Sequence, residues 1–351
     1  MRIAQVSPLI ESVPPKYYGG IERIVAYLTE ELITQGHDVT LFASGDSATT
    51  APLVSVVDDA LRLGNLDDPL PYHILLLEAL AKRRHEFDVV HYHLGFEHFP
   101  LARHMGTPNV TTQHGRLDLT GIQIMLREFA DLPVVSISNH QRRPIPDANW
   151  IETVSNGIPE DLFTYQSKAG NYLAFLGRAS PEKGLHTALE IAEACGMDLK
   201  IAAKVDKVDE EYFAQRVQPF LKQPNVEFLG EIAETEKNDL LGNAAAMLFP
   251  IDWPEPFGLV MIEAMACGTP VIAFRRGSVP EVIDHGKTGF IVQSIEEAVT
   301  AVGKIDTISR QHCRDVFTER FTSKCMANGY LDVYKKLIET TNRPDRIAEY
   351  G

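Results

Sequence analysis

Residues 253–283 read WPEPFGLVMIEAMACGTPVIAFRRGSVPEVI and contain the clearest structural pattern in the chain. Two prolines and Gly258 interrupt the backbone just before an amphipathic run, residues 259–267, and a glycine and a proline follow that run. This punctuation predicts a helix with a marked start and stop. The apolar run 271–274 comes next and predicts a buried strand, so the expected unit is strand, tight turn, helix and strand. Such a unit places a helix start at the carboxyl edge of a parallel sheet, where open α/β folds bind ligands.

Two carboxylates, Glu255 and Glu263, lie on either side of that helix start. The free N–H groups of Phe257, Gly258 and Leu259 and the helix dipole favour a phosphate there. A carboxylate beside a phosphate is repelled by it, unless the carboxylate accepts hydrogen bonds from polar groups such as sugar hydroxyls. The pattern therefore fits a nucleotide sugar, which offers a diphosphate and hydroxyls together. The alternative is that Glu255 is a solvated loop residue and Glu263 a charge on the helix surface.

The stretch resembles the E-x7-E signature of family 4 of the retaining glycosyltransferases, through EPFGxxxxEAxAxGxPVI followed by GSVPEVI. That family has the GT-B fold, so the resemblance implies an α/β protein with two doubly wound Rossmann-like domains that face a cleft. It also implies that Glu255 holds hydroxyls of the donor sugar and that Glu263 holds the ribose. The amides of Phe257, Gly258 and Leu259 would then bind the diphosphate.

Apolar, strand-like runs alternate with helical patterns along the whole chain, which predicts mostly parallel sheets with helices on both faces. The runs lie at residues 3–7, 39–43, 54–57, 89–92, 110–112, 134–137, 151–154, 172–176, 199–203, 226–229, 246–249, 271–274 and 290–292. The polar stretch 164–171 marks the expected boundary. We therefore expect an acceptor-side domain at residues 1–165 and a nucleotide-sugar-binding domain at residues 170–322. By the family resemblance, a helix at residues 323–345 crosses back onto the first domain.

The composition is typical of a soluble globular protein, with 351 residues, 44% hydrophobic and 23% charged. We expect a cytoplasmic protein without stable membrane insertion, because the N-terminus has no signal-peptide pattern and no apolar run approaches the ~20 residues of a membrane span. The formal net charge of −15 argues against a nucleic-acid partner. Four cysteines without C-x-x-C spacing are expected to be reduced thiols rather than zinc ligands.

The segment LGRASPEKG at residues 176–184 joins the first strand of the second domain to its helix. Arg178 and Lys183 would place two cations beside the diphosphate, where charge-assisted contacts strengthen as the leaving group gains charge. Alternatively, the segment is only a helix start with Ser180 as its cap and a lysine on the surface. Relatives in the family carry a matching GRxxxxKG, so the resemblance assigns the donor phosphates to Arg178 and Lys183.

Gly19 and Gly20 follow the first strand, where a nicotinamide or flavin enzyme would carry GxGxxG, which is missing. By the resemblance, this glycine pair contacts donor and acceptor; alternatively, it is only a turn before a helix. His114 follows the strand-like run that ends at Gln113. The resemblance gives His114 a contact with the reacting sugar, whereas a lone histidine can also be structural.

Three further features belong to the predicted site. His91 and His93 form an H-x-H that predicts either a metal site or, since no carboxylate has motif spacing, the lining of an acceptor site. Ile232 falls in the segment that resembles the family's base-recognition loop. The residues AAKV at 202–205 stand where relatives commonly have GxG, so this pocket departs from the family pattern.

The chain contains no D-x-D triplet, which is the usual metal-diphosphate anchor of the other major glycosyltransferase fold. Arg178, Lys183 and a helix dipole can neutralise a leaving group in place of Mg²⁺, so we expect no metal and no cofactor beyond the nucleotide-sugar co-substrate. The sequence identifies no carboxylate as a covalent nucleophile. Front-face attack with the leaving phosphate as base therefore fits a retaining reaction better than the two-carboxylate mechanism of glycosidases.

The expected reaction moves a hexose from a nucleotide-diphosphate sugar to a hydroxyl of a small-molecule, sugar or glycan acceptor. A UDP-sugar is favoured, and GDP-mannose is the other donor considered. One alternative is an enzyme of another class on the same fold, such as a nucleotide-sugar epimerase; a phosphorylase would need a pyridoxal lysine context that the sequence lacks. Another is a non-catalytic nucleotide-sugar-binding protein. The fold alone does not separate these readings, whereas the intact motif set favours transfer.

Overall fold

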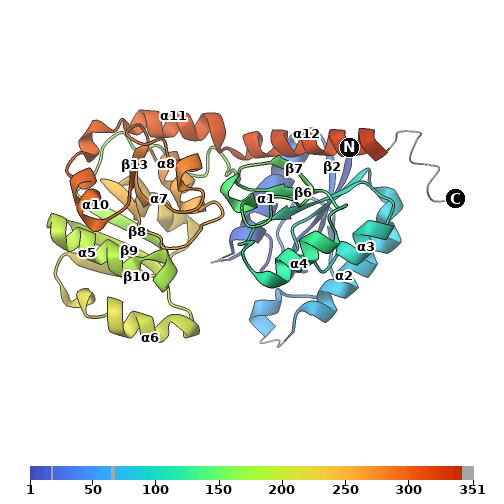
Figure 1. Ribbon diagram of the computed structural model, residues 1–351, viewed down its shortest axis with the longest axis horizontal. Helices are drawn as coiled ribbons and strands as arrows, with labels where there is room; N and C mark the ends of the chain where they lie inside the picture. The colour runs from blue at the N-terminus through green and yellow to red at the C-terminus, as the bar shows by residue number, and fades with distance from the viewer. Residues whose placement is uncertain (17–18, 65–67, 342–351) are drawn as a thin grey trace. The chain divides into compact units, whose positions relative to one another are not determined.

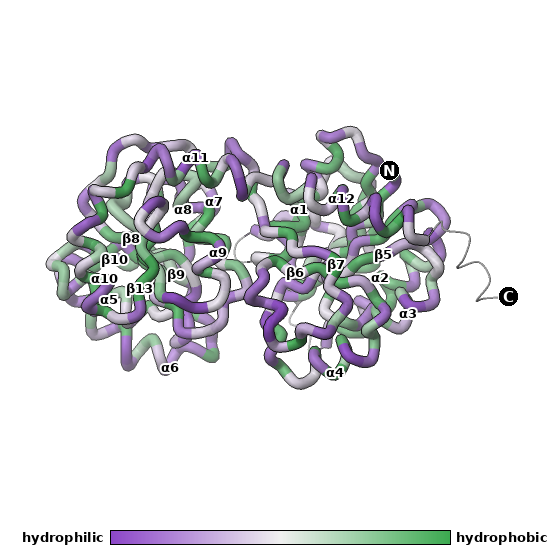
Figure 2. Tube along the Cα trace, turned by 45° about the horizontal axis from the view of Figure 1, so that its top comes forward, coloured by the Kyte–Doolittle hydropathy of each residue, from purple (hydrophilic) through white to green (hydrophobic). Residues whose placement is uncertain are grey.

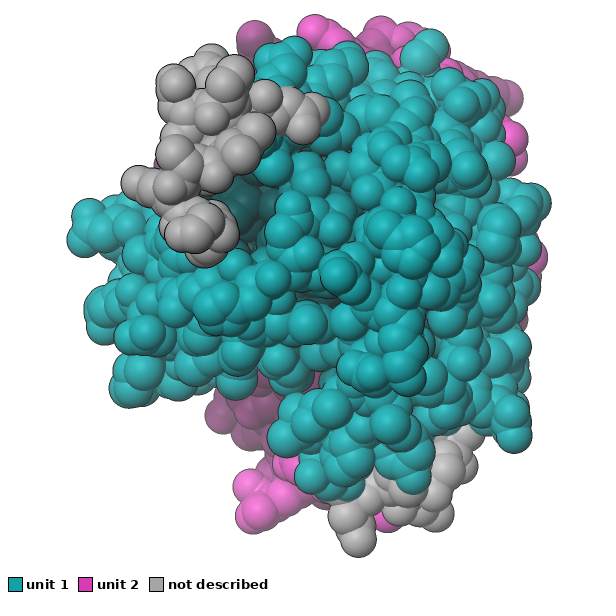
Figure 3. Space-filling model, turned by 90° about the vertical axis from the view of Figure 1, so that its right-hand side faces the viewer, with its two compact units in different colours: residues 1–157, 323–351 teal, residues 158–322 magenta. Residues whose placement is uncertain are grey.

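The computed structural model of the protein describes residues 1–16, 19–64 and 68–341 (Figure 1). The contacts within the chain divide it into two compact units, which are coloured separately in Figure 3. Unit 1 consists of residues 1–157 together with the C-terminal residues from 323 onward, and unit 2 consists of residues 158–322. Residues 323–341 therefore belong to the same unit as the first half of the chain.

Unit 1 contains, within the described residues, a parallel sheet of seven strands in the order β3-β2-β1-β4-β5-β6-β7. The strands are β1 (Arg2–Val6), β2 (Asp38–Phe42), β3 (Leu53–Val54), β4 (Val89–Tyr92), β5 (Asn109–Gln113), β6 (Val134–Ser136) and β7 (Trp150–Thr153). Its helices are α1 (Gly20–Thr34), α2 (Leu70–Arg83), α3 (Phe99–His104), α4 (Thr120–Glu128) and α12 (Ser323–Thr341). The strand order reverses between β1 and β4, which is where doubly wound sheets bind ligands.

Unit 2, all of whose residues are described, has a parallel sheet of six strands in the order β10-β9-β8-β11-β12-β13. The strands are β8 (Tyr172–Arg178), β9 (Asp198–Lys204), β10 (Val226–Gly230), β11 (Ala246–Phe249), β12 (Val271–Phe274) and β13 (Gly289–Val292). Its helices are α5 (Leu185–Cys195), α6 (Glu210–Tyr212), α7 (Glu234–Gly242), α8 (Leu259–Ala266), α9 (Val279–Val282), α10 (Ile295–Val302) and α11 (Arg310–Arg320). Here the strand order reverses between β8 and β11.

The strands were visible in the sequence because helices cover both faces of a parallel sheet. Such strands are buried on both sides and read as continuous apolar runs rather than alternating ones. Strands β4 and β11 read VVHY and AMLF, and every residue in them is buried. Figure 2 shows hydrophobic residues gathered along the strands and hydrophilic ones on the loops. Each predicted strand-like run overlaps a strand of the structure, and the prediction of two doubly wound α/β sheets is confirmed.

Helix α12 packs beside α1 and contacts β4 within unit 1 (Figure 1). Its buried face carries Tyr330 and Tyr334, both with no exposed surface. Residues 342–345, which the sequence assigned to the same helix, lie outside the described residues. Within the described ranges, no helix has both the length and the apolar character that crossing a bilayer requires.

The change from unit 1 to unit 2 falls after Gly157, earlier than the boundary that the sequence placed between 165 and 170. Polar composition suggested a linker at 164–171, but two arginines on α11 hold residues 160–166 within unit 2. Arg310 donates to Gln166 O at 2.7 Å, and Arg314 donates to Glu160 O at 2.7 Å. Because these partners lie more than a hundred residues away in sequence, composition could not reveal them.

Arg310→Met is expected to destabilise unit 2. The guanidinium is buried and also donates to Gly242 O at 2.7 Å and Ala244 O at 2.9 Å, so its loss leaves buried carbonyls without donors. We expect a loss on the order of 3 kcal/mol, with a lower melting temperature and faster amide hydrogen exchange at residues 158–166.

Arg216→Ala is the control, because Arg216 makes an exposed ion pair with Glu190 at 3.8 Å. Its removal should change stability by less than about 0.5 kcal/mol. Equal effects of the two substitutions would contradict the structural role given to Arg310.

Candidate functional site

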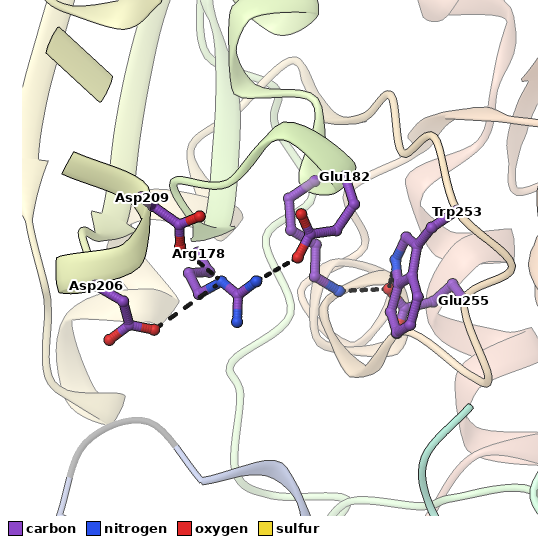
Figure 4. Close-up of polar contacts among 7 residues, drawn as sticks. Arg178, Glu182, Asp206, Asp209, Trp253 and Glu255 are labelled. Atoms are coloured by element: carbon purple, nitrogen blue, oxygen red, sulfur yellow. Dashed lines mark hydrogen bonds and ion pairs between the residues drawn. The ribbon is translucent and has the colours of Figure 1, made fainter. Parts of the chain in front are cut away.

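Two loops meet at the carboxyl edge of the sheet in unit 2, because the strands they leave, β8 and β11, are neighbours at the reversal of strand order. Lys183, from the loop after β8, donates to Glu255 Oε2 in the loop after β11. Trp253 Nε1 donates to the same oxygen at 2.9 Å, and Lys183 Nζ lies 4.8 Å from the centre of the Trp253 ring (Figure 4). A lysine and an indole thus fix the Glu255 carboxylate, of which 8% is exposed.

Glycines allow the loops to approach this closely. Gly184 follows Lys183 with φ of +71°, and a Cβ at this position would lie 2.1 Å from Pro250 O. Gly277, in the loop after β12, has φ of +54°, and its Cβ would lie 2.2 Å from Glu255 O. Both the positive φ and the contact distance exclude other residues without backbone movement. The two glycines therefore hold the backbone that carries Lys183 and Glu255.

Glu263 lies in α8 and is 2% exposed. Lys237 Nζ, from α7, donates to Glu263 Oε1 at 2.9 Å and lies 3.3 Å from Glu234 Oε2. The second oxygen, Glu263 Oε2, is buried and has no hydrogen-bond partner within the described part of the chain. A buried carboxylate oxygen without a donor is unfavourable, so this atom is suited to accept a hydrogen bond from a ligand.

The start of α8 also has free hydrogen-bonding groups. Gly258 is its N-cap residue and offers no side-chain cap. The N–H groups of Phe257 and Gly258 have no acceptor among the described residues. Leu259 is the first residue of the helix and, like Gly258, is half-buried. The helix dipole and these N–H groups together favour an anion at this position.

Arg178 does not share the partners of Lys183. It donates to Glu182, and its Nε lies 3.1 Å from Asp209 Oδ2 and 4.0 Å from Asp206 Oδ2 (Figure 4). Burial raises the pKa of the Asp209 carboxyl. Three carboxylates therefore surround one guanidinium in the absence of a ligand, and an anion would have to compete with them for Arg178.

The last residue predicted in unit 2, Ile232, follows β10 at the same edge of the sheet and is half-buried. In unit 1, Gly19 is the N-cap residue of α1 and Gly20 begins the helix. The preceding Tyr17 and Tyr18 lie outside the described residues.

His114 directly follows β5 in unit 1. Its Nε2 lies 2.9 Å from His93 Nδ1, and burial lowers its pKa to about 4, so the ring is neutral at physiological pH. Gln141 Nε2 donates to the carbonyl oxygens of Gln113 at 2.8 Å and Gly115 at 2.7 Å, which fixes the backbone on both sides of His114.

The prediction that His91 and His93 line an acceptor site is wrong. Both side chains are buried, with 0% and 1% exposed. Each ring bonds to neighbouring side chains: His91 to Thr112 Oγ1 at 2.7 Å and His93 to Gln5 Oε1 at 2.8 Å. Side chains two residues apart on a strand share one face, so the sequence correctly placed His91 and His93 on the same side. That face, however, is covered by α12. No group of residues suited to hold a metal occurs in the described part of the chain.

Sequence reasoning missed several residues that shape these sites. Lys237, Trp253 and Asp209 contact predicted residues, and Gln141 holds the backbone on both sides of His114, but none of the four carries a motif of its own. Trp253 stands two residues before Glu255, so its position in the quoted stretch was the one available signal. The other three come from separate elements, and only the folded chain places them.

Two doubly wound parallel sheets, with unpaired hydrogen-bonding groups at the carboxyl edge of the second, define the GT-B class of glycosyltransferase fold. A sequence model described as "Glycosyl transferases group 1" matches residues 159–317, and one described as "Glycosyltransferase Family 4" matches residues 18–167. Together the two models cover most of the chain. The protein therefore belongs to the family 4, or group 1, glycosyltransferases, and the resemblance carried by the E-x7-E motif is confirmed.

Individual relatives agree with this assignment. The chain is 27% identical to the glycogen synthase of Mycobacterium tuberculosis, over 82% of this chain and 81% of that protein. It is 25% identical to the phosphatidyl-myo-inositol mannosyltransferase of the same organism, over 92% of this chain and 90% of that protein. Among solved structures, Anabaena HepE in complex with UDP-glucose has a TM-score of 0.73 at 18% identity, over 96% of this chain and 100% of that chain.

Glu22, in the first turn of α1 after the glycine pair, gives the protein a pH dependence that can be measured. Burial raises the pKa of its carboxyl to about 7, and the charge of Glu11 adds to the shift. The folded state therefore binds this proton more tightly than the unfolded state, and stability falls as the pH rises from 4.5 to about 7. The shift corresponds to about 3 kcal/mol of unfolding free energy.

Glu22→Gln removes this titration. Its melting temperature should exceed that of the wild type at pH 8 and converge with it at pH 5. Melting temperatures of the two proteins that stay parallel from pH 5 to 8 would show that the carboxyl does not titrate in this way.

Proposed function

We propose that this glycosyltransferase moves a hexose from a nucleotide-diphosphate sugar to a hydroxyl acceptor, with retention of anomeric configuration and without a metal ion. The observation that carries the proposal is the unpartnered Glu263 Oε2, which is buried on α8, the same helix whose start carries the free N–H groups. A ligand that satisfies both must present a hydroxyl and an anion. A nucleoside diphosphate does so through its ribose and its phosphates.

Glu263 is suited to hold the ribose. Lys237 already occupies Oε1 and supplies a compensating charge, so Oε2 is free to accept from a hydroxyl. The hydrogen bond from the lysine also orients the carboxylate before the donor binds. A hydrogen bond to a charged acceptor in a buried site contributes about 1.5–3 kcal/mol.

Lys183 is suited to bind the diphosphate. In the absence of a donor its charge is balanced by Glu255, and a phosphate at the start of α8 would draw the ammonium away from that carboxylate. Glu255, still held by Trp253, would then accept from hydroxyls of the hexose. Arg178 is a second phosphate ligand, but three carboxylates compete for it. We therefore expect Lys183 to contribute more than Arg178.

The reaction proceeds by front-face attack of the acceptor hydroxyl, with the leaving phosphate taking its proton. Lys183, Arg178 and the N–H groups at the start of α8 would stabilise the charge that develops on the diphosphate. His114 contacts the reacting sugar as a neutral imidazole, in keeping with its pKa of about 4.

A UDP-sugar is the favoured donor, and GDP-mannose is the second. The likeness to HepE, whose structure contains UDP-glucose, supports the first. The likeness to a phosphatidyl-myo-inositol mannosyltransferase is the reason to test GDP-mannose as well. The acceptor is a small molecule, a sugar or a glycan.

The proposal is tested by measuring nucleotide release from UDP-, GDP- and ADP-sugars, each with and without EDTA. One donor should be consumed, at a rate that EDTA does not change. Glu263→Ala and Lys183→Met should each lower kcat/KM roughly 10- to 100-fold, and Arg178→Ala should lower it less.

Glu227→Ala is the control, because this exposed carboxylate on β10 forms an ion pair on the surface with Lys200 at 3.1 Å. It should leave the rate unchanged. Absence of both release and binding with every donor would overturn the proposed function, and loss of activity in EDTA would overturn its metal-free form.

A further inference from the structure

A buried chain of polar side chains connects α12 to His114 within unit 1. Tyr334 Oη lies 3.1 Å from Gln5 Nε2, Gln5 Oε1 lies 2.8 Å from His93 Nε2, and His93 Nδ1 lies 2.9 Å from His114 Nε2. The first three residues are buried, and His114 is half-buried at the end of β5. The function proposed above uses only the last member of this chain.

The imidazoles in this chain are neutral. Burial lowers the pKa of His91 and of His93 well below 6.5 and that of His114 to about 4. A neutral imidazole has one nitrogen that donates and one that accepts. In a ring that is hydrogen-bonded at both nitrogens, the role of one nitrogen therefore fixes the role of the other.

The direction follows from the Gln5 amide. Its nitrogen donates to Tyr334 Oη, and its oxygen can only accept, so His93 Nε2 must carry the hydrogen. His93 Nδ1 is then an acceptor, and His114 Nε2 must donate to it. This leaves His114 Nδ1 unprotonated. That nitrogen has no hydrogen-bond partner among the residues that the structure describes.

The direction of donation can also be followed along a second branch of the network, which runs from Tyr334 through His91 to Thr112. Tyr334 Oη accepts from Gln5 and gives its only hydrogen to His91 Nδ1 at 2.7 Å. His91 Nε2 then donates to Thr112 Oγ1 at 2.7 Å, which lies 2.9 Å from Tyr330 Oη. Both ring nitrogens of His91 therefore have a partner, in keeping with the pairing that buried polar groups require.

We propose that His93, Gln5 and Tyr334 are positioning residues that hold His114 in its Nε2-protonated tautomer. His114 Nδ1 is thereby presented as an acceptor for a hydroxyl of the reacting sugar. The inference rests on the proposed function for this sugar contact, but the tautomer itself does not depend on it. Helix α12 thus has a second role besides packing, because it supplies the tyrosine that fixes the Gln5 amide.

The tautomer is measured by two-bond ¹H–¹⁵N NMR of the full-length protein at pH 7 with ¹⁵N-labelled histidine, using His114→Asn to assign the signal. The wild type should show His114 protonated at Nε2 alone. His93→Gln can accept and donate as His93 does and should preserve this tautomer, whereas His93→Leu should give a mixture. Tyr334→Phe keeps the packing but frees the Gln5 amide to rotate, and should also give a mixture.

Steady-state kinetics distinguish a positioning role of His93 from a purely structural one. His93→Leu should lower kcat roughly 10- to 100-fold with KM within a factor of about 3, and His93→Gln should recover most of that loss. The melting temperatures of both variants are measured alongside.

A wild-type His114 protonated at Nδ1 would overturn the inference without any variant. So would a His93→Leu protein that folds and keeps the single Nε2-protonated form. If no donor is consumed by the wild type, the proposed function fails while the tautomer result still stands, so the two failures are distinguishable.

Discussion

A buried carboxylate must be paired or hydrogen-bonded, and unit 2 is built around two of them, Glu255 and Glu263. Each is met by a lysine from a different element, Lys183 after β8 and Lys237 on α7. The reversal of strand order between β8 and β11 brings the first pair together, and the packing of α7 on α8 brings the second. The topology of the fold therefore also determines which charged groups meet in the site, because it brings each buried carboxylate to its lysine.

Unit 1 repeats the same doubly wound topology with different chemistry at the corresponding edge. His114 at that edge is joined by hydrogen bonds to a buried network of neutral imidazoles, an amide and two tyrosine hydroxyls. Such a network tolerates burial because its members pair with one another, and it specifies geometry more than it adds stability. The candidate site of unit 2 is thus built from charged side chains, whereas the network around His114 in unit 1 is built from neutral ones.

The sequence predicted the fold well because parallel strands buried on both faces leave continuous apolar runs, as in β4 and β11. It also predicted the positions of Glu255 and Glu263 at a helix start. It did not predict contacts across elements: Lys237 has no motif, and two of the acidic partners of Arg178, Asp206 and Asp209, come from the segment after β9. The boundary and the histidine pair were misjudged for the same reason, because Arg310 and α12 act on them from distant parts of the chain.

The most direct test of the account is the crystal structure of the protein with the nucleoside diphosphate of its donor. We predict the ribose on Glu263 Oε2, the diphosphate against the N–H groups of Phe257 and Gly258, and Lys183 moved from Glu255 to a phosphate. A nucleotide that binds elsewhere, while Glu263 Oε2 stays without a partner and Lys183 stays on Glu255, would contradict the central claim that these buried carboxylates and their lysines form the donor site.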